Sequence, residues 1–293
     1  MNKLLTIITP TYNRGGFLAR IYECLLKQTS NDFEWLVIDD GSTDNTREEL
    51  EKLQSRTDRS FVMEFYLKPN GGKHTALNYA FPYIKGELSL ILDSDDLLTE
   101  DAVETVLSVW QKYKNDDKIC GLSFLRGKTA DEALASFPEE EFRSNHIDFR
   151  INKNIEGDCC EVVRSDILKK YPFPVFEGER FVGENVLWVN IALEYDTVYV
   201  RKVLYLCEYL EGGLTKSGRK FRMNNPLGGM ESSRVELNKR IKLRQRIKKA
   251  ILYSCYGFKA GMKRKEILKT SGYPFLVGLF MPFGRYFYKH WSK

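Results

Sequence analysis

Residue types that build redox or zinc centres are scarce in this chain of 293 residues. It has three histidines and six cysteines, and the cysteines show neither a CxxC pair nor the spacing of zinc ligands. Their positions are Cys24, Cys120, Cys159, Cys160, Cys207 and Cys255. We therefore expect reduced thiols of a cytoplasmic protein, and we exclude a disulfide framework or a zinc module.

Long hydrophobic runs are also missing. The longest candidate, PFLVGLFMPF at 274–283, holds two prolines and is shorter than the roughly 18 residues that cross a bilayer. A strand-like run begins almost directly after Met1, so no cleavable signal is expected. The sequence predicts no membrane-spanning helix, and its length suits one large domain or two smaller ones.

Acidic residues are rare in the last part of the chain. From Arg234 onward there are 16 Lys and Arg against only Glu236 and Glu266, whereas the rest has 29 basic and 38 acidic residues. We expect the basic, aromatic-rich helical tail at 229–293 to face an anionic membrane surface, because leucines and aromatics alternate there with cations. A helix packed on the body, a homo-oligomer surface and nucleic acid are the alternatives, and no known nucleic-acid module is apparent.

Apolar periodicity predicts strands that alternate with helices at short spacing. Strands are expected at KLLTIITP, EWLVIDD, FVMEFYL, ELSLILD and KICGLSFLR, with helices between them, one of which runs from Lys73 to Ile84. This alternation is typical of an α/β fold with a mostly parallel, doubly wound sheet and helices on both faces. Further on we expect surface excursions at 124–154, a helix in ENVLWVNIALEY, a mobile basic loop at 211–229 and a long helix from Met230 to Ser254.

Unusual polar strings follow the first four predicted strands. They are TPTYNR, DDGSTD, KPNGGKH and DSDD. Ligands of such sheets bind outside the carboxyl ends of the strands, so these strings predict an active site. No GxGxxG fingerprint follows the first strand, which argues against an ordinary dinucleotide site.

The stretch LSLILDSDDL ends an apolar strand with Asp93, Asp95 and Asp96. Three carboxylates so close together repel one another unless a cation joins them. Mg²⁺ or Mn²⁺ is often shared between one or two carboxylates and a substrate diphosphate. The alternative is that one of them only complements the dipole of the next helix. Similarly, Lys73 and His74 at a helix start suit either a phosphate site or an ordinary glycine-rich turn.

Together, TPTYNR, DDGSTDNT, NGGKHTALN and LDSDD resemble, in order and spacing, the motifs of the family 2 glycosyltransferases of bacterial glycan assembly. These are inverting enzymes with a GT-A fold. The resemblance is strong over 3–125 and weaker to about 215. It implies a GT-A domain at 1–228, with a nucleotide-binding half at 1–125 and an acceptor half at 126–228.

The resemblance also implies roles for individual residues. Those assigned to the nucleotide are Thr9, Pro10, Thr11, Tyr12, Arg14, Asp40, Asn70, Gly71, Lys73, Asp93 and Ser94. Among them, Asp40 resembles the carboxylate that binds uracil. Asp95 resembles the metal ligand of the DxD motif, Asp93 would lie nearer the ribose, and Asp96 is a further ligand candidate. The implied cofactor is Mn²⁺ or Mg²⁺.

An inverting transferase needs a base that deprotonates the acceptor hydroxyl. The family usually has a Glu-Asp pair at the start of a helix late in the domain. Here the corresponding string is FVGENVLW, with Glu184 and Asn185. We expect Glu184 to be the base, with Asp158 as the alternative. A third possibility is that Glu184 only complements its helix dipole. Residues expected near the acceptor or on the mobile loop are Trp188, Lys216 and Arg219.

The expected function is therefore metal-dependent transfer of a sugar, with inversion, from a nucleotide-sugar (a UDP-sugar first) to a glycan or lipid-linked acceptor. The place would be the inner face of the cell membrane. A nucleotidyltransferase is one alternative, although TPTYNRGGF lacks the longer basic, glycine-rich loop of that class. A non-catalytic nucleotide-sugar or glycan-binding module is the other, which Asn185 keeps open.

Overall fold

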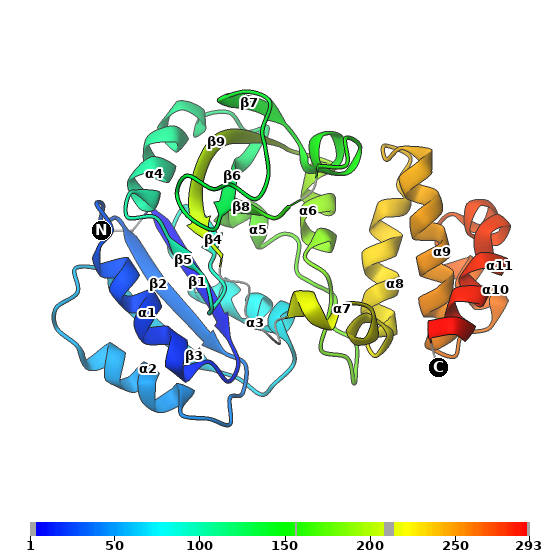
Figure 1. Ribbon diagram of the computed structural model, residues 1–293, viewed down its shortest axis with the longest axis horizontal. Helices are drawn as coiled ribbons and strands as arrows, with labels where there is room; N and C mark the ends of the chain where they lie inside the picture. Colours follow the sequence, from blue (N-terminus) through cyan, green and yellow to red (C-terminus); the bar gives the residue numbers. More distant parts are fainter. Residues whose placement is uncertain (1–3, 156, 208–213, 292–293) are drawn as a thin grey trace. The chain divides into compact units, whose positions relative to one another are not determined.

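The computed structural model describes residues 4–155, 157–207 and 214–291 (Figure 1). They form two compact units. The first comprises Met1–Asn145, Ile155–Pro172 and Glu194–Leu210. The second comprises His146–Asn154, Phe173–Leu193 and Glu211–Lys293. Segments 146–154 and 173–193, which we expected in an acceptor half, thus belong with the C-terminal helices.

Within the described residues, the first unit is built on one nine-stranded sheet in the order β3-β2-β1-β4-β8-β6-β9-β5, with β7 paired to β9. The strands are β1 (Leu5–Thr11), β2 (Phe33–Asp39), β3 (Val62–Leu67), β4 (Leu88–Ile91), β5 (Leu97–Leu98), β6 (Ile119–Gly127), β7 (Glu141–Ser144), β8 (Cys159–Arg164) and β9 (Asp196–Leu206). All five strands predicted up to residue 126 are confirmed.

The pairing divides the sheet into two parts. From β3 to β4 all neighbours are parallel, and β1, β2 and β4 are buried along their whole length. Such continuous apolar runs are typical of parallel strands covered on both faces. Beyond β4 the sheet is mixed, because β8 runs antiparallel to both β4 and β6. The doubly wound α/β fold is confirmed, with its parallel part concentrated in the first four strands.

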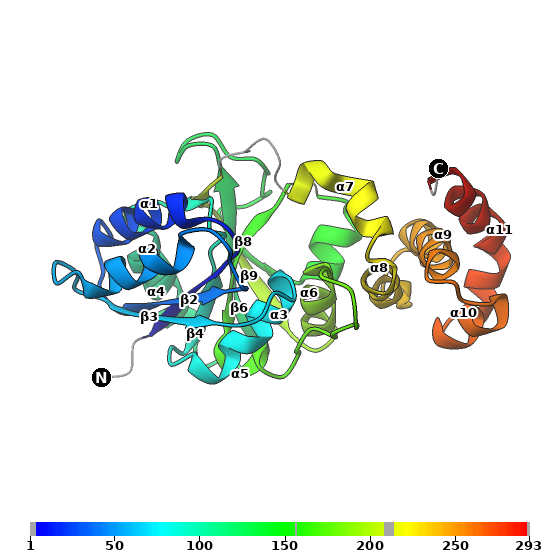
Figure 2. The same ribbon diagram turned by 90° about the horizontal axis from the view of Figure 1, so that it is seen from below.

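Helices cover both faces of this sheet (Figure 2). They are α1 (Gly15–Leu26), α2 (Thr46–Ser55), α3 (Lys73–Ala80), the 3-10 turn η1 (Phe81–Tyr83), α4 (Ala102–Tyr113) and α5 (Ser165–Leu168). The helix expected as far as Ile84 ends early, since Pro82 has no N–H for a regular helical bond. The expected excursions after Phe124 include a strand, β7, which pairs with β9.

The second unit is helical. Its elements are the π-helix η2 (His146–Ile151), α6 (Asn185–Ala192), α7 (Leu214–Met223), α8 (Pro226–Arg234), the 3-10 turn η3 (Val235–Leu237), α9 (Leu243–Lys259), α10 (Arg264–Thr270) and α11 (Pro274–Trp291). A separate apolar core joins α7 to α11, with Leu237, Tyr253, Ile267 and Val277 buried in it. Among the described residues, no helix is long and apolar enough to span a bilayer.

Two expectations for this unit were wrong. Residues 214–223 form α7 rather than a loop; Gly218 kinks the helix, with φ of 43°, instead of preventing it. The glycines at 212 and 213 lie outside the described residues. The long helix expected from Met230 to Ser254 is interrupted between η3 and α9. There, the Asn238 side chain accepts a hydrogen bond from the backbone N–H of Arg240 at 2.9 Å, a local bond that competes with the helix.

Candidate functional site

The first four polar strings meet at one edge of the sheet. The parallel register places Thr11 beside Asp39 and Asp39 beside Leu67, so β1, β2 and β3 end together. Strand β4 lies on the other side of β1 and runs in the same direction. From β1 the chain continues to β2 and β3 on one side of β1, and from β3 it returns to β4 on the other side. Such a switch point in the strand order is where open α/β sheets bind ligands.

Hydrogen bonds join the segments that follow β1 and β2. The N–H of Asn13 donates to Ser42 Oγ at 2.8 Å, and the N–H of Thr43 donates to Asn13 Oδ1 at 2.8 Å. Gly41 has φ of 76°, and a Cβ there would lie 2.6 Å from the backbone nitrogen of Asn70. The close approach of these loops therefore requires glycine at this position.

Asp40 organises the loop after β3. Its Oδ1 accepts from Lys68 Nζ at 2.5 Å and from the N–H of Gly71 at 3.0 Å. Its Oδ2 accepts from the N–H of Gly72 at 2.6 Å and from Asn70 Nδ2 at 3.2 Å. These four donors occupy the carboxylate, so Asp40, Asn70 and Gly71 brace one another. In this structure the Asp40 carboxylate holds the loop, and its role towards a base stays a prediction.

The acidic cluster after β4 contains its own counter-charges. Asp93 forms an ion pair with Lys73 at the start of α3, and Arg126 Nη1 lies 3.9 Å from Asp93 and 3.9 Å from Asp96. Burial by itself would raise the pKa of Asp93, but Lys73 and Arg126 outweigh it and lower that pKa. Asp93 therefore stays a carboxylate in this environment.

Asp96 is the most buried acid of the cluster, and its pKa is raised to about 6. The largest cause is burial, and the neighbouring Asp93 and Asp95 add to it by repulsion. Behind it, Arg126 lies over the ring of Tyr205 at 4.0 Å and donates to the carbonyl of Cys159 at 2.8 Å. The Tyr205 hydroxyl in turn accepts from the N–H of Asp93 at 2.8 Å. Arg126 and Tyr205 thus support the acidic cluster of Asp93 and Asp96 through an ion pair and a backbone hydrogen bond.

Asp95 differs from its neighbours. Among the described residues, its carboxylate forms a single ion pair, with Arg14 at 4.0 Å. About a quarter of the side chain is exposed. Among the described residues, no three acidic, histidine or cysteine side chains converge as a ready-made metal cage. One accessible carboxylate still fits Mg²⁺ or Mn²⁺, because such ions commonly take their remaining ligands from a diphosphate and water.

The segment expected to contact the nucleotide lies at the end of β1. Thr9 is fully buried and its hydroxyl accepts from Trp35 Nε1 at 2.9 Å, so it belongs to the core. Thr11 is only 3% exposed, and its Oγ1 has no partner among the described residues. Tyr12 is 44% exposed. A buried hydroxyl without a partner calls for an explanation, and a bound ligand at this sheet edge supplies one.

The remaining predicted residues are placed as follows. Pro10 and Ser94 are buried at the ends of β1 and β4, and Asp158 is exposed just before β8. Glu184 is the N-cap residue of α6 in the second unit, and Trp188 is half-buried on the same helix. Residues Lys216 and Arg219 are both on α7. The side chain of Lys216 lies outside the described part, whereas Arg219 lies over the ring of Trp291 at 4.5 Å.

Asn185 has a clear structural partner set. Its Nδ2 donates to the carbonyl of Ser232 at 2.8 Å and to Glu236 Oε1 at 2.8 Å. Glu236 also pairs with Lys249 at 2.7 Å. The side chain thus fastens the start of α6 to α8 and η3. An aspartate at this position would place its carboxylate against the two acceptors that the amide now satisfies.

Three further residues of this edge, Lys68, Arg126 and Tyr205, were not predicted from the sequence. Each lies in or directly after a strand, where a polar side chain at the end of an apolar run is the available signal. That signal exists for Arg126 in the string LSFLR. The contacts of these three residues depend on the order of the strands in the sheet, and the local sequence pattern does not predict that order.

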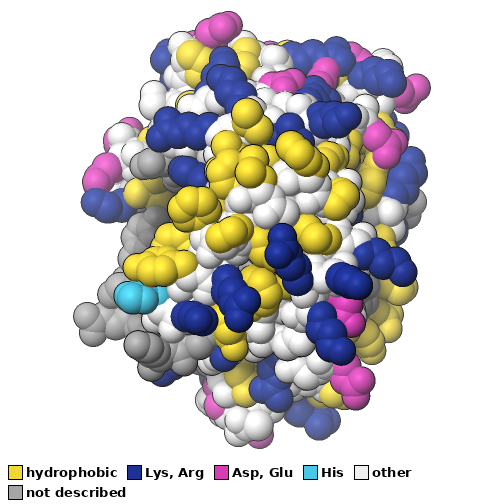
Figure 3. Space-filling model, turned by 90° about the vertical axis from the view of Figure 1, so that its right-hand side faces the viewer, with side chains coloured by type: hydrophobic (Ala, Val, Ile, Leu, Met, Phe, Trp, Pro, Cys, Tyr) yellow, Lys and Arg dark blue, Asp and Glu magenta, His cyan; other side chains and the backbone are white. Residues whose placement is uncertain are grey.

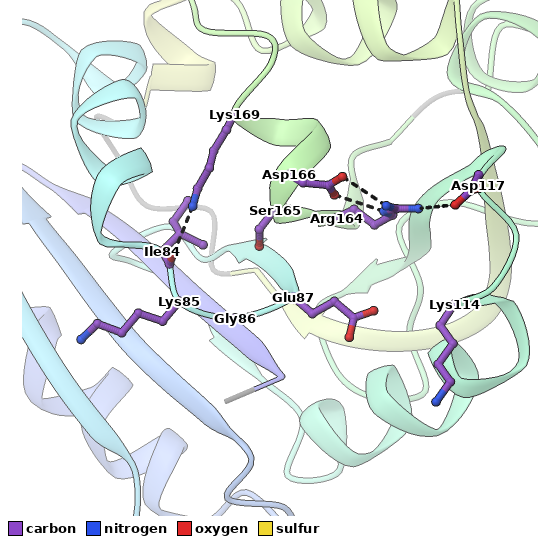
Figure 4. A pocket seen from close by; sticks show the side chains of 10 residues that line it. All are labelled: Ile84, Lys85, Gly86, Glu87, Lys114, Asp117, Arg164, Ser165, Asp166 and Lys169. Atoms are coloured by element: carbon purple, nitrogen blue, oxygen red, sulfur yellow. Dashed lines mark hydrogen bonds and ion pairs between the residues drawn. The ribbon is translucent and has the colours of Figure 1, made fainter. Parts of the chain in front are cut away.

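A surface pocket of about 500 Å³ lies at the opposite edge of the sheet, near the start of β4 (Figure 4). Most of its charged side chains have partners within the protein. Arg164 pairs with Asp166 at 3.1 Å and with Asp117 at 3.7 Å, and Lys169 donates to the carbonyl of Ile84 at 3.1 Å. The candidate site is therefore the carboxyl edge and not this pocket.

Known proteins resemble the chain in sequence over most of its length. The family model described as Glycosyl transferase family 2 matches residues 6–171. Glycosyltransferase GlyG of Streptococcus pneumoniae serotype 4 is 35% identical over 228 residues, which are 74% of each chain. The GalNAc(5)-diNAcBac-PP-undecaprenol beta-1,3-glucosyltransferase of Campylobacter jejuni is 28% identical over 237 residues, 79% of this chain and 73% of that protein.

Solved structures share the fold. S. aureus TarS 1-349 in complex with UDP-GlcNAc has a TM-score of 0.63 at 18% identity, covering 98% of this chain and 92% of that one. The mannosyltransferase PcManGT of Pyrobaculum calidifontis, in complex with GDP-Man and Mn2+, has a TM-score of 0.59 at 15% identity, covering 98% and 82%. These structures show the GT-A fold of the chain. With the family match over more than half its length, the chain belongs to glycosyl transferase family 2.

Proposed function

We propose that this protein transfers a sugar from a nucleotide diphospho-sugar, a UDP-sugar in first place, to a glycan or lipid-linked acceptor with inversion of the anomeric centre. The observation that carries the proposal is the carboxyl edge of the parallel strands. There, Thr11 ends β1 with a hydroxyl that has no partner among the described residues. Asp93 and the accessible Asp95 follow the neighbouring strand β4, and Asp93 is paired with Lys73 at the start of α3. The known structures with UDP-GlcNAc and GDP-Man are consistent with it.

In this proposal the donor lies over the end of β1. Tyr12, exposed by 44%, contacts the base, and Thr11 donates or accepts a hydrogen bond at the nucleoside. Asp93 and Ser94 lie towards the ribose. Lys73 lies at the first position of α3, where a cation and a helix N-terminus together suit a diphosphate.

Asp95, with Asp93 and Asp96 beside it, would hold Mn²⁺ or Mg²⁺. When bound, such an ion neutralises the charge that develops on the leaving diphosphate. Asp93 is already paired with Lys73, and Arg126 serves Asp93 and Asp96, so we assign direct ligation to Asp95 first. Arg14, 4.0 Å from Asp95, is placed to contact a phosphate oxygen on the same side.

The base we propose is Glu184. It is the N-cap residue of α6, next to the positive end of the helix dipole, where an acidic side chain is favourable. The carboxylate would accept the proton of the attacking acceptor hydroxyl. Trp188, four residues later on α6, would offer an apolar face to the acceptor sugar.

A lipid-linked glycan at the inner face of a cell membrane is the acceptor class that we favour. The name of the relative from C. jejuni includes a polyprenol diphosphate, and the C-terminal helices of this chain are strongly basic. An anionic membrane surface is therefore the partner we propose for them.

The test is release of nucleoside diphosphate from a panel of nucleotide sugars, with Mn²⁺ or Mg²⁺ and with a chelator. We expect turnover with a UDP-sugar that the chelator abolishes. Asp95→Asn should reduce turnover at least about 100-fold, as loss of a preorganised charge in an active site does. The matched control is Asp117→Asn, whose side chain is 97% exposed. Metal-independent turnover, or an unaffected Asp95→Asn enzyme, contradicts the metal assignment.

A further inference from the structure

Helix α11 is apolar on two opposite sides. Val277, Met281 and Gly284 face the core of the second unit and are buried. Phe275, Leu279, Phe283 and Tyr286 are exposed by 86%, 59%, 56% and 57%. Their spacing of four, four and three residues keeps them on one side of the helix, opposite the buried side. This stripe extends about 17 Å along α11.

A helix that only needed to be solvated on its outer side would carry polar residues there. Exposed apolar residues are normal when single, but an aligned aromatic stripe marks an interaction site. Pro274 and Pro282 are exposed as well, which extends the apolar surface. The inner side of α11 is already occupied, since Gly284 approaches α9 so closely that a Cβ would lie 1.9 Å from Ser254 Oγ. The outer stripe is therefore available to a partner.

Charge around the stripe indicates what the partner is. From residue 263 to the end of α11 there are six Lys and Arg and a single acid, Glu266. The Glu266 side chain is engaged at the start of α10, where it accepts from the N–H of Lys263 at 2.7 Å. The exposed cations are Lys263, Arg264, Lys265, Lys269, Arg285 and Lys289. Figure 3 shows an apolar band on this face with Lys and Arg on both sides of it.

An apolar stripe bordered by cations is suited to the boundary between lipid headgroups and acyl chains. The aromatic rings occupy that boundary well, because they combine apolar area with tolerance of the interface. We propose that the outer side of α11 docks on an anionic bilayer, with Phe275, Leu279, Phe283 and Tyr286 inserted and the cations of α10 and α11 on the phosphate groups. Helix α9 instead packs on α8 and α11 and supports the docking face.

Docking is measured without substrate, so its failure is separate from failure of the transfer reaction proposed above. The test is flotation of the full chain with vesicles of phosphatidylcholine alone and with vesicles that also contain phosphatidylglycerol. We expect flotation with the anionic vesicles, at least about tenfold weaker with the neutral ones, because each cation near an anionic surface strengthens binding several-fold. High salt should weaken it.

Two sets of variants locate the contact. Phe275→Ser with Phe283→Ser should reduce flotation at least about tenfold, and the control is Val62→Ser with Val175→Ser, two exposed apolar residues elsewhere. Arg285→Glu with Lys289→Glu should reduce binding to anionic vesicles at least as much, and the control is Lys27→Glu with Lys114→Glu, which are also exposed. All four proteins should keep the melting temperature of the parent within a few degrees.

Three outcomes would overturn the proposal. The first is a parent protein that floats with neither vesicle. The second is flotation unchanged by both stripe and charge variants. The third is a dimer, seen by light scattering, that the stripe variant dissociates while the parent fails to bind lipid, because a second copy of the chain would then cover α11.

Discussion

At the scale of single residues, Asn185 shows how a departure from a family pattern can be read physically. Its amide donates to both Ser232 and Glu236, so it is built into the second unit. Aspartate is the residue that the family resemblance leads one to expect at this position. Its carboxylate could not donate the two hydrogen bonds and would face the Ser232 carbonyl and the Glu236 carboxylate, which are both acceptors. A charge or polar group that is left without a partner away from water usually destabilises the fold by more than one hydrogen bond stabilises it.

We therefore predict that Asn185→Asp lowers stability by about 1–3 kcal/mol and leaves turnover no higher than that of the parent. Glu184→Gln, by contrast, should keep donor binding and stability but lose at least about 100-fold in turnover. Urea unfolding, calorimetric binding of UDP and diphosphate release measure the three quantities. An Asn185→Asp enzyme of higher activity would contradict the purely structural role of Asn185. A Glu184→Gln enzyme of near-normal activity would exclude Glu184 as the base.

Arg126 is the second residue whose environment makes a sharp prediction. It is nearly buried, lies over Tyr205 and serves two carboxylates at 3.9 Å. Removing one partner of a buried ion pair typically costs about 3–5 kcal/mol, since the remaining charge is left uncompensated. Arg126→Met should therefore lower the free energy of unfolding by that order and weaken UDP binding through the displaced Asp93.

Arg126→Lys should lose less, because it keeps the charge while giving up the bond to Cys159. The matched control is Arg201→Met, an exposed arginine paired with Glu140, which should cost at most about 1 kcal/mol. If Arg126→Met is no less stable than Arg201→Met, Arg126 does not hold the acidic cluster.

At the scale of elements, the contact between α9 and α11 depends on a missing side chain. A Cβ on Gly284 would lie 1.9 Å from Ser254 Oγ and 2.7 Å from the carbonyl of Ile251. Gly284→Ala should therefore separate the helices and lower stability by about 1–3 kcal/mol, even though alanine is the better helix former. Gly278→Ala on the same helix meets only Leu268, at 3.4 Å, and is the control. Equal melting temperatures for the two variants would contradict this packing.

The strand-end site was predictable because its rule is local. At the carboxyl end of each parallel strand the sequence changes from apolar to polar residues, and the carboxyl ends of parallel strands lie at the same edge of the sheet. Asp93, Asp95 and Lys73 were found in this way. Their support from Arg126 and Tyr205 was not, because β6 and β9 reach the site through the antiparallel β8, a pairing between residues far apart in the chain.

The helical unit shows a different limit. Glycine content predicted a loop at 211–229, but residues 214–223 form a helix, where packing of Met223 in the core overrides a weak local preference. The aromatic tail was expected to be helical, yet sequence alone could not tell which of its apolar residues face inward. Helix α11 is apolar around most of its circumference, so only its packing against α9 separates Val277 and Met281 from Phe275 and Leu279.

At the scale of the whole molecule, the dependence of stability on pH can be traced to buried histidine. His74 is 2% exposed, and burial lowers its pKa to about 4, against an ordinary value near 6.5. Between these values the unfolded chain binds the proton and the folded protein does not. Stability is therefore complete above about pH 6.5 and falls as the pH decreases towards 4, by up to about 3 kcal/mol from this group.

His74→Gln removes that proton-binding difference. The variant should therefore lose less stability than the parent between pH 7 and pH 4.5, whatever its stability at pH 7. Groups that titrate in both proteins, such as Asp96 with its raised pKa, cancel in the comparison. Urea unfolding at several pH values measures the effect, with His290→Gln, at an exposed position, as the control. Parallel pH profiles for parent and His74→Gln would contradict this prediction. They would mean that the folded protein binds a proton at His74 as readily as the unfolded chain does.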